Sequence, residues 1–211
     1  MRSIRELFED TTLVEKIKMK LPKFFQIVES ENKRGGKTGM EVGTAREKII
    51  IALLIHKFGE ENVITEIPTT EAEVDVKLFD NAISIKTITS DQKTPKGVKL
   101  KWTANRDAAV KFRDSYKPSC DMLITHIWWA NIGGLYYIPL ETQLNVWQSV
   151  GRVAYMNDPK PNTNPRGIEI MPEVMQKLIE DQRTMRMSIL WKSETVNYNP
   201  YGRWLELWKE D

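Results

Sequence analysis

The sequence predicts a single α/β domain in which a central mixed β-sheet is flanked by helices. Segments with the 3.6-residue apolar period of helices alternate with segments that have the two-residue period or the short apolar runs of strands. The chain has 211 residues, of which 41% are hydrophobic and 28% are charged, so it can bury a substantial core within one domain. This length fits one domain, or one domain with a small appendage, and we expect a single domain over residues 1–211.

Helical patterns alternate with loops along the whole chain. Residues 1–35 are expected to form a helical N-terminal region, with helical periodicity over residues 3–30 that Pro22 should interrupt. A basic glycine-rich loop at residues 33–39 leads into a strong helix at residues 41–58, which Gly59 should end. Further helices are expected, in chain order, at residues 103–116, 140–149 and 172–183.

Strand patterns lie between these helices. They are expected, in chain order, at residues 63–67, 73–79, 82–89, 122–129, 135–138, 167–171 and 185–191. We interpret Gly133 and Gly134 as a turn between two of the strands. Only Asp80 and Asn81 separate residues 73–79 from residues 82–89, and this spacing is typical of a tight β-hairpin.

The predicted hairpin has one apolar face and one charged face. With Asp80 and Asn81 as the two loop residues, Asp75 lies opposite Lys86, and strand alternation separates the side chains into two sets. The set expected in the core is Val74, Val76, Leu78, Ile83 and Ile85. The set expected on the other face is Glu73, Asp75, Lys77, Ser84 and Lys86.

The pair of Asp75 and Lys86 suits phosphodiester hydrolysis. A carboxylate can hold a divalent cation that polarises the phosphate and lowers the pKa of a bound water, and a lysine can orient that water or stabilise developing charge. The alternative is an ordinary cross-strand salt bridge, which contributes at most about 1 kcal/mol at the surface. The pair by itself leaves both interpretations open.

The hairpin resembles the PD-(D/E)xK motif of type II restriction endonucleases and related nucleases. In EVDVKLFDNAISIKT, residues 73–87, Asp75 matches the first acid, and residues 84–86 match the (D/E)xK tripeptide. Val74 replaces the proline, and Ser84 stands where the second acid is expected, so one metal ligand is missing. The resemblance implies a restriction-endonuclease-like core over about residues 40–140 and a Mg²⁺ cofactor, for which Mn²⁺ could substitute.

Further segments are similar to a small group of restriction enzymes related to ThaI, which cuts CGCG. They are VKLKWTANRDAA, PSCDMLITHIWW, GGLYYIPLETQ and TNPRGIEI. The resemblance implies double-stranded DNA as the substrate, a homodimer that reads a palindromic target, and a functionally paired DNA methyltransferase.

A glutamate from the helix at residues 41–58 could supply the missing acid. Glu47 lies on an otherwise apolar face of that helix, where a carboxylate costs several kcal/mol unless it is paired or bound to metal. In the resembled family a glutamate from this helix often completes the metal site, so Glu47 is the first candidate and Glu41 the second. Glu73, two residues before Asp75, is a further candidate. The alternatives are a solvated acid near the helix start for Glu47 and an ordinary surface acid for Glu73.

Two basic stretches stand out in a chain whose net charge is only +2. Residues 86–117 hold nine Lys/Arg against three Asp, and residues 16–37 hold seven Lys/Arg against two Glu. They indicate a phosphate-facing side, or simply two solvated surfaces. The residues expected to contact the DNA backbone are Lys37, Lys93, Lys96, Lys99, Lys101 and Arg106.

Two further features could contact the bases. Asn164 and Arg166, in the proline-rich loop at residues 157–167, are candidates for reading base edges, although an ordinary surface loop is the alternative. Met40 follows the basic glycine loop and could insert between base pairs as an apolar wedge, although core or cap packing is the alternative.

We therefore expect a type II restriction endonuclease in which Asp75 and Glu47 bind Mg²⁺, Lys86 positions the attacking water, and Ser84 contributes a hydroxyl or a bound water. The alternatives are a repair or junction-resolving nuclease with the same core and a non-catalytic DNA-binding module. The single cysteine, Cys120, and the longest apolar run of seven residues, 49–55, predict a cytoplasmic protein without a membrane segment.

Overall fold

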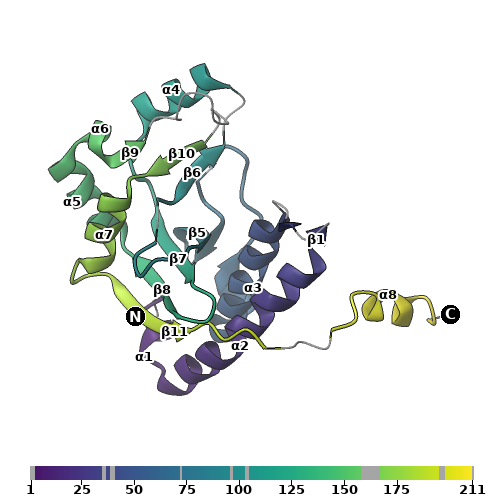
Figure 1. Ribbon diagram of the computed structural model, residues 1–211. Coiled ribbons are helices and arrows are strands. Elements are labelled where there is room, and N and C mark those ends of the chain that lie inside the picture. The colour runs from purple at the N-terminus through teal and green to yellow at the C-terminus, as the bar shows by residue number, and fades with distance from the viewer. Residues whose placement is uncertain are drawn as a thin grey trace.

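A six-stranded mixed sheet forms the centre of the computed structural model, which describes residues 3–34, 37–38, 41–71, 73–95, 97–102, 105–157, 167–194 and 198–210. The strand order is β11-β8-β7-β5-β4-β3. In chain order, the strands are β3 (Val63–Ile64), β4 (Val76–Leu78), β5 (Asn81–Thr89), β7 (Asp121–Ile127), β8 (Ile132–Ile138) and β11 (Met185–Leu190). Only β5 and β7 are parallel neighbours within this sheet, and helices flank it (Figure 1). The predicted α/β class with a central mixed sheet is confirmed.

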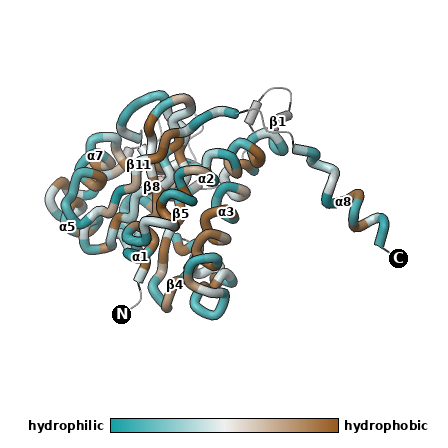
Figure 2. Tube along the Cα trace, turned by 90° about the horizontal axis from the view of Figure 1, so that it is seen from below, coloured by the Kyte–Doolittle hydropathy of each residue, from teal (hydrophilic) through white to brown (hydrophobic). Residues whose placement is uncertain are grey.

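Three helices cover one face of the sheet: α1 (Glu6–Glu9), α2 (Thr11–Glu31) and α3 (Glu41–Phe58). Ile50 and Leu54 of α3 belong to the same buried cluster as Val76 and Ile83 of the hairpin. Apolar residues accordingly gather where α3 meets the strands (Figure 2). A short 3₁₀ helix, η1 (Glu60–Asn62), connects α3 to β3.

The break in the N-terminal helical region falls at Asp10 and not at Pro22, so that prediction is wrong. Asp10 caps α2 by accepting a hydrogen bond from the amide of Leu13 at 3.0 Å. The helix continues through Pro22 to Glu31, although a proline cannot donate the helical hydrogen bond. Pro22 is itself buried, as are Leu21 and Phe25, and this packing stabilises the helix across the missing bond.

A second layer covers the other face of the sheet. It contains a three-stranded sheet of β6 (Lys99–Trp102), β10 (Gly167–Ile170) and β9 (Met156–Asn157). Its helices are α4 (Arg106–Ser115), α5 (Leu140–Val150), α6 (Arg152–Tyr155) and α7 (Pro172–Glu180). Met122 and Ile124 of β7 join this layer in a second buried cluster. The central sheet therefore separates two cores.

The hairpin of β4 and β5 forms as predicted, but its predicted register is wrong. Phe79 and Asp80 form the loop, with φ angles of 49° and 64°, and Val76 pairs with Ile83. Phe79 is held there because its amide donates to the Asn62 carbonyl at 3.0 Å and its ring packs on Phe58 at 5.5 Å. Continuing this register sets Asp75 opposite Ser84 instead of Lys86.

The slip in register preserves the predicted faces. It amounts to two residues, and a two-residue slip returns each side chain to the same side of a strand. The described core therefore includes four of the expected hairpin residues, namely Val76, Leu78, Ile83 and Ile85. The side chains predicted for the polar face therefore stay together on one face, although the predicted register is wrong.

Gly133 and Gly134 lie within β8, so the predicted turn at these residues is wrong. The chain reverses earlier, where the amide of Asn131 donates to the carbonyl of Trp128 at 2.9 Å and Ala130 has a φ of 63°. A Cβ atom on Gly133 would lie 2.2 Å from the His126 carbonyl oxygen. Gly133 thus permits close packing and does not form a turn.

The remaining elements are small. β1 (Lys33–Arg34) and β2 (Lys37–Thr38) form an antiparallel pair where a loop was expected, and α8 (Gly202–Leu207) stands apart from the rest of the molecule (Figure 1). Among the described helices, none has the length and apolar character needed to cross a membrane. The expected extent of the domain, residues 1–211 with a catalytic core at about 40–140, stays a prediction.

Candidate active site

Asp75 lies immediately before β4, and three donors from β5 hold its carboxylate. The amide of Ile85 donates to Asp75 Oδ2 at 2.6 Å, and the Ser84 hydroxyl donates to the same oxygen at 3.2 Å. The Lys86 ammonium is also 3.2 Å from Oδ2. All three donors act on one oxygen, so β5 sets the orientation of the carboxylate.

The ion pair of Lys86 and Asp75 is largely removed from solvent. The Lys86 side chain is 19% exposed and that of Asp75 is 20% exposed. Lys86 reaches Asp75 even though the two residues are not directly opposed in the sheet, because its long side chain spans the offset. The contact expected from the sequence therefore exists, through a diagonal arrangement of the strands.

Glu47 lies near this pair, on the second turn of α3. Burial raises the pKa of its carboxyl above the ordinary value, and the negative charge of Asp75 raises that pKa further. The charge of Lys86 acts in the opposite direction. Glu47 is therefore half-buried beside another carboxylate and differs from a fully solvated acid at a helix start.

Glu47 and Lys86 border a groove of about 840 Å³. One wall comes from α3 and includes Glu41, Gly43, Thr44 and Glu47. The floor comes from Ile85, Lys86 and Thr87 of β5, and the other wall from Lys99, Leu100 and Lys101 of β6. In Figure 1, α3 and β6 lie on either side of β5. The groove thus combines two α3 acids with three strand lysines.

The residues expected to bind DNA are only partly brought together. Lys99 and Lys101 line the groove, where Lys99 lies 3.7 Å from Glu169 and Lys101 lies 5.3 Å from the ring centre of Phe112. Lys93 is exposed in the segment after β5, and Arg106 is exposed at the start of α4, outside the described lining of the groove. The side chain of Lys37 and the residues Met40, Lys96, Asn164 and Arg166 lie outside the described part of the structure.

Glu73 has a different hydrogen-bond partner from those of Asp75. The Ser119 hydroxyl donates to Glu73 Oε2 at 2.6 Å. Burial raises the pKa of the neighbouring Cys120 thiol to about 12, and the charge of Glu73 contributes to this rise. Neither Glu73 nor Asp75 is among the described residues that line the groove, whereas Glu41 lines it but is exposed.

The sequence did not single out several residues of the site. Thr44 and Thr87 line the groove, and Arg46 forms a buried ion pair with Glu29 that ties α3 to α2 one residue before Glu47. Gly43 faces the groove, and among the described residues beyond its own stretch of α3 no atom lies within 4 Å of the place where a Cβ atom would be. A glycine inside a strong helical pattern was the signal that could have identified this position.

The chemistry of the donor set fits a divalent cation that takes few protein ligands. Within the described residues, no three His, Cys, Asp or Glu side chains gather as a metal-binding group. Mg²⁺ needs fewer protein ligands, because it retains waters and binds substrate phosphates alongside one or two carboxylates. Asp75 and Glu47 supply two carboxylates, and a cation would offset the repulsion from Asp75 that adds to burial in raising the pKa of Glu47.

Comparisons with known proteins cover nearly the whole chain. Residues 7–210 match the family model described as "Restriction endonuclease ThaI". A solved structure described as "Restriction endonuclease in complex with substrate DNA" is similar, with a TM-score of 0.89 and 46% sequence identity. That similarity covers 99% of this chain and 99% of the solved chain. No curated protein matches this chain.

Proposed function

Because the chain belongs to the ThaI restriction endonuclease family and is a type II restriction endonuclease, we propose that it cleaves duplex DNA with Mg²⁺ held by Asp75 and Glu47. This proposal rests on the proximity of two elements, the β4–β5 hairpin and α3. The hairpin presents Asp75 with Lys86 at 3.2 Å, and α3 presents Glu47 to the groove that Lys86 lines. Mn²⁺ is expected to substitute for Mg²⁺.

When bound, the cation supplies polarisation of the scissile phosphate and a lower pKa for an attacking water. Asp75 and Glu47 would hold the cation, and the donors on Asp75 Oδ2 keep that carboxylate oriented. The Lys86 ammonium orients the attacking water and stabilises the negative charge that develops on the phosphate. Ser84 acts through its hydrogen bond to Asp75, in the position where the related motif has a second acid.

Lys99 and Lys101 are proposed to contact the DNA backbone. Phosphate contacts position a duplex without reading its sequence. Both lysines stand on the β6 wall of the groove, facing the acids of α3. This arrangement brings a phosphate toward the carboxylates while the lysines balance the added negative charge.

The similar solved restriction endonuclease was captured with its substrate DNA. For the present chain we propose the same class of substrate and a homodimer, because two identical sites are needed to cut both strands of a palindromic target. A cytoplasmic enzyme of this kind is proposed to work with a DNA methyltransferase that protects the host sequence.

Plasmid digestion tests the proposed site. We expect the wild type to cut the plasmid at fixed positions in the presence of Mg²⁺. Addition of EDTA should stop this cleavage. Asp75→Asn, Glu47→Gln and Lys86→Met should each slow cleavage at least about 100-fold. Lys77→Met is the matched control, because Lys77 lies on the adjacent strand and pairs with Glu71 at 2.8 Å. Normal cutting by Asp75→Asn and Lys86→Met would refute the site.

A second measurement detects binding of the cation and does not require cleavage of DNA. Addition of Mg²⁺ should raise the thermal stability of the wild type, by about 2.7 kcal/mol when its concentration is 100 times its Kd. Asp75→Asn and Glu47→Gln should lose most of this stabilisation, and Lys77→Met should keep it. Equal stabilisation of all four proteins would place the cation elsewhere.

A further inference from the structure

Three acids lie at alternate positions in the segment that leads into β4, and each has different partners. Glu71 Oε1 accepts from the Lys77 ammonium at 2.8 Å. Glu73 Oε2 accepts from the Ser119 hydroxyl at 2.6 Å. The partners of Asp75 all belong to β5. Of the three acids, Glu73 is therefore the one that is bonded to a segment outside the hairpin, between α4 and β7.

The sheet does not hold this segment by itself. β4 begins one residue after Asp75, and the amide of Asp75 donates to the carbonyl of Ile83 at 3.0 Å. Before this point, the amide of Val74 donates to the carbonyl of Glu71 at 2.9 Å, which is a bond within the segment. Among the described hydrogen bonds of residues 71–75, only those of Glu73 reach the side of the fold that contains α4.

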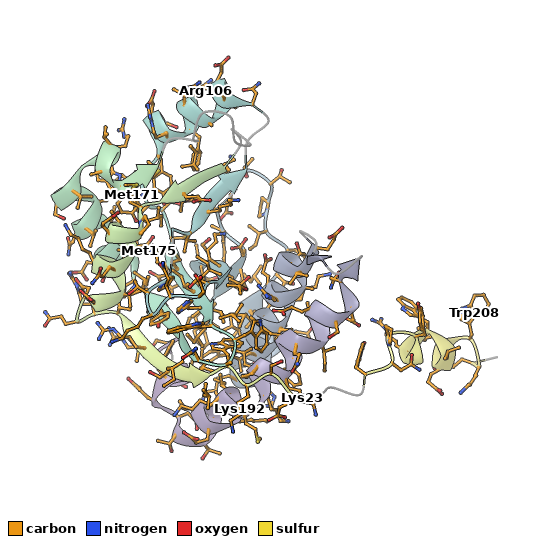
Figure 3. The ribbon with its side chains drawn as sticks, in the orientation of Figure 1. Lys23, Arg106, Met171, Met175, Lys192 and Trp208 are labelled. Carbon is orange, nitrogen blue, oxygen red and sulfur yellow. The ribbon has the colours of Figure 1, made fainter. Side chains whose placement is uncertain are left out.

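The partners of Glu73 lie on a buried aromatic cluster. Tyr116 is 4% exposed, and its ring centre lies 5.3 Å from that of Phe112 and 6.2 Å from that of Tyr155. Burial raises the pKa of the Tyr116 phenol, and the charge of Glu73 and a hydrogen bond between the two side chains raise it further. Tyr116 and Tyr155 belong to the buried cluster of the second layer, which also contains Met175 (Figure 3). Glu73 is thus anchored to a closely packed part of the molecule.

The same aromatic cluster contacts the β6 wall of the groove. Lys101 Nζ lies 5.3 Å from the ring centre of Phe112, and Phe112 packs on Tyr116. One support in the second layer therefore contacts both a lysine that lines the groove and the acid two residues before Asp75. Glu73 fixes the segment that carries Asp75 relative to this wall.

We propose that Glu73 is a positioning residue, which keeps the Asp75 carboxylate in place for the cation by anchoring its segment to the second layer. This role requires a hydrogen-bond acceptor at residue 73 and not a negative charge, so an amide can replace the carboxylate. A metal ligand would instead require the charge. The proposal rests on the proposed function, because it takes Asp75 as a ligand of the cation.

Binding of Mg²⁺ to the full chain, measured without DNA, tests this role. Thermal unfolding at increasing Mg²⁺ concentrations gives the Kd of the cation. Glu73→Ala should weaken binding by about 10-fold to 100-fold, the usual effect of removing a group that orients a metal ligand. Glu73→Gln should stay within about threefold of the wild type, since its amide oxygen still accepts a hydrogen bond. Circular dichroism should show an unchanged fold for both variants.

Glu71→Ala is the matched control. It removes an acid and its ion pair from the same segment, but the partner of Glu71 is Lys77, which lies within the hairpin. Its Kd for Mg²⁺ should equal that of the wild type. Ser119→Ala, at an exposed position, removes only the hydroxyl donor and should weaken binding in the wild type but not in the Glu73→Ala background.

Stability without the cation separates positioning from a general structural role. A purely structural role of Glu73 would lower the free energy of unfolding in EDTA and leave the Kd for Mg²⁺ unchanged. Positioning predicts the changed Kd, and at saturating Mg²⁺ the Glu73→Ala protein should regain most of the wild-type cleavage rate.

Three results would overturn the proposal: an unchanged Kd in Glu73→Ala, an equal loss in Glu73→Gln and Glu73→Ala, or an equal loss in Glu71→Ala. Asp75→Asn distinguishes this proposal from the proposed function. Full Mg²⁺ binding by Asp75→Asn would refute the proposed cation site itself. Loss of binding in Asp75→Asn together with normal binding in Glu73→Ala would refute only the positioning role.

Discussion

Burial and the neighbouring Asp75 both oppose a negative charge on the Glu47 carboxyl. Its pKa is raised in the folded protein above the ordinary value of 4.5, so the folded state binds a proton more tightly than the unfolded chain does. The contribution of Glu47 to stability therefore falls as the pH rises from about 4.5 through the raised pKa.

Replacing Glu47 by Gln should stabilise the metal-free protein above this pH range. We expect the free energy of unfolding in EDTA to be higher for Glu47→Gln than for the wild type at pH 8, with a smaller difference at pH 4. Urea unfolding across this range measures the effect. Glu60→Gln, at an exposed position, is the control. A difference that does not change with pH would contradict the electrostatic explanation.

His126 makes the stability of the protein depend on pH with a sign opposite to that of Glu47. It is fully buried and lies 2.8 Å from the Ser90 hydroxyl, and burial lowers its pKa from 6.5 to about 4. As the pH falls below 6.5, the unfolded chain takes up a proton that the folded protein resists. Stability should fall until about pH 4, by at most about 3 kcal/mol.

The variant His126→Gln should lose this part of the acid sensitivity, even if its stability is lower at every pH. Urea unfolding between pH 7 and pH 4 compares the slopes. His56→Gln, on the exposed side of α3, controls for the loss of a histidine. Equal slopes for His126→Gln and the wild type would show that other groups dominate acid unfolding.

At the scale of elements, Gly43 weakens α3 while opening the groove. A glycine inside a helix costs about 0.5–1 kcal/mol relative to alanine. Because no atom of the described residues outside this part of α3 lies within 4 Å of the position of a Cβ atom, Gly43→Ala should stabilise the fold by about this amount. The added methyl group points into the groove proposed for DNA, so duplex binding should weaken.

Urea unfolding and fluorescence anisotropy with a labelled duplex in Ca²⁺ measure the two effects of Gly43→Ala. Ala45→Gly is a useful comparison, since it should destabilise α3 at a position outside the described lining of the groove. A Gly43→Ala protein that is more stable and binds DNA as tightly as the wild type would place the duplex away from this wall.

The elements also show how far a sequence can predict this site. The helix at Glu41–Phe58 and the alternation of the hairpin follow from local patterns, so both were predictable. The register was not, because Phe79 takes its left-handed conformation from contacts with Phe58 and Asn62, which are distant in the sequence. The pairing of Asp75 with Lys86 survived because a two-residue slip keeps the faces.

At the scale of the whole molecule, charge placement matters more than net charge, which is only +2. Lys99 and Lys101 lie in the groove, so replacing both by Gln should weaken DNA binding and reduce the slope of log K against log salt by about 1.8. Lys18→Gln with Lys23→Gln removes the same charge from α2. This control should change the slope much less, and equal slopes for the two double variants would contradict the proposed path of the DNA.

Whole-molecule organisation was only partly predictable. The order of helices and strands indicated the α/β class, but no local pattern indicated that β6 would form a wall opposite α3. That wall depends on the pairing of β6 with β10, a strand about seventy residues later in the chain. The separation of α8 from the rest of the molecule likewise depends on contacts at Gln26 and Glu31.

The two proposed metal ligands belong to elements that meet only through long-range packing. Glu47 is brought to the hairpin by the burial of Ile50 and Leu54 against the sheet. During synthesis, a chain in which α3 has not yet docked therefore carries one acid in place and lacks the second. On the proposed assignment, such an unfinished chain cannot damage the chromosome of the cell that produces it, because nuclease competence arises together with the completed core.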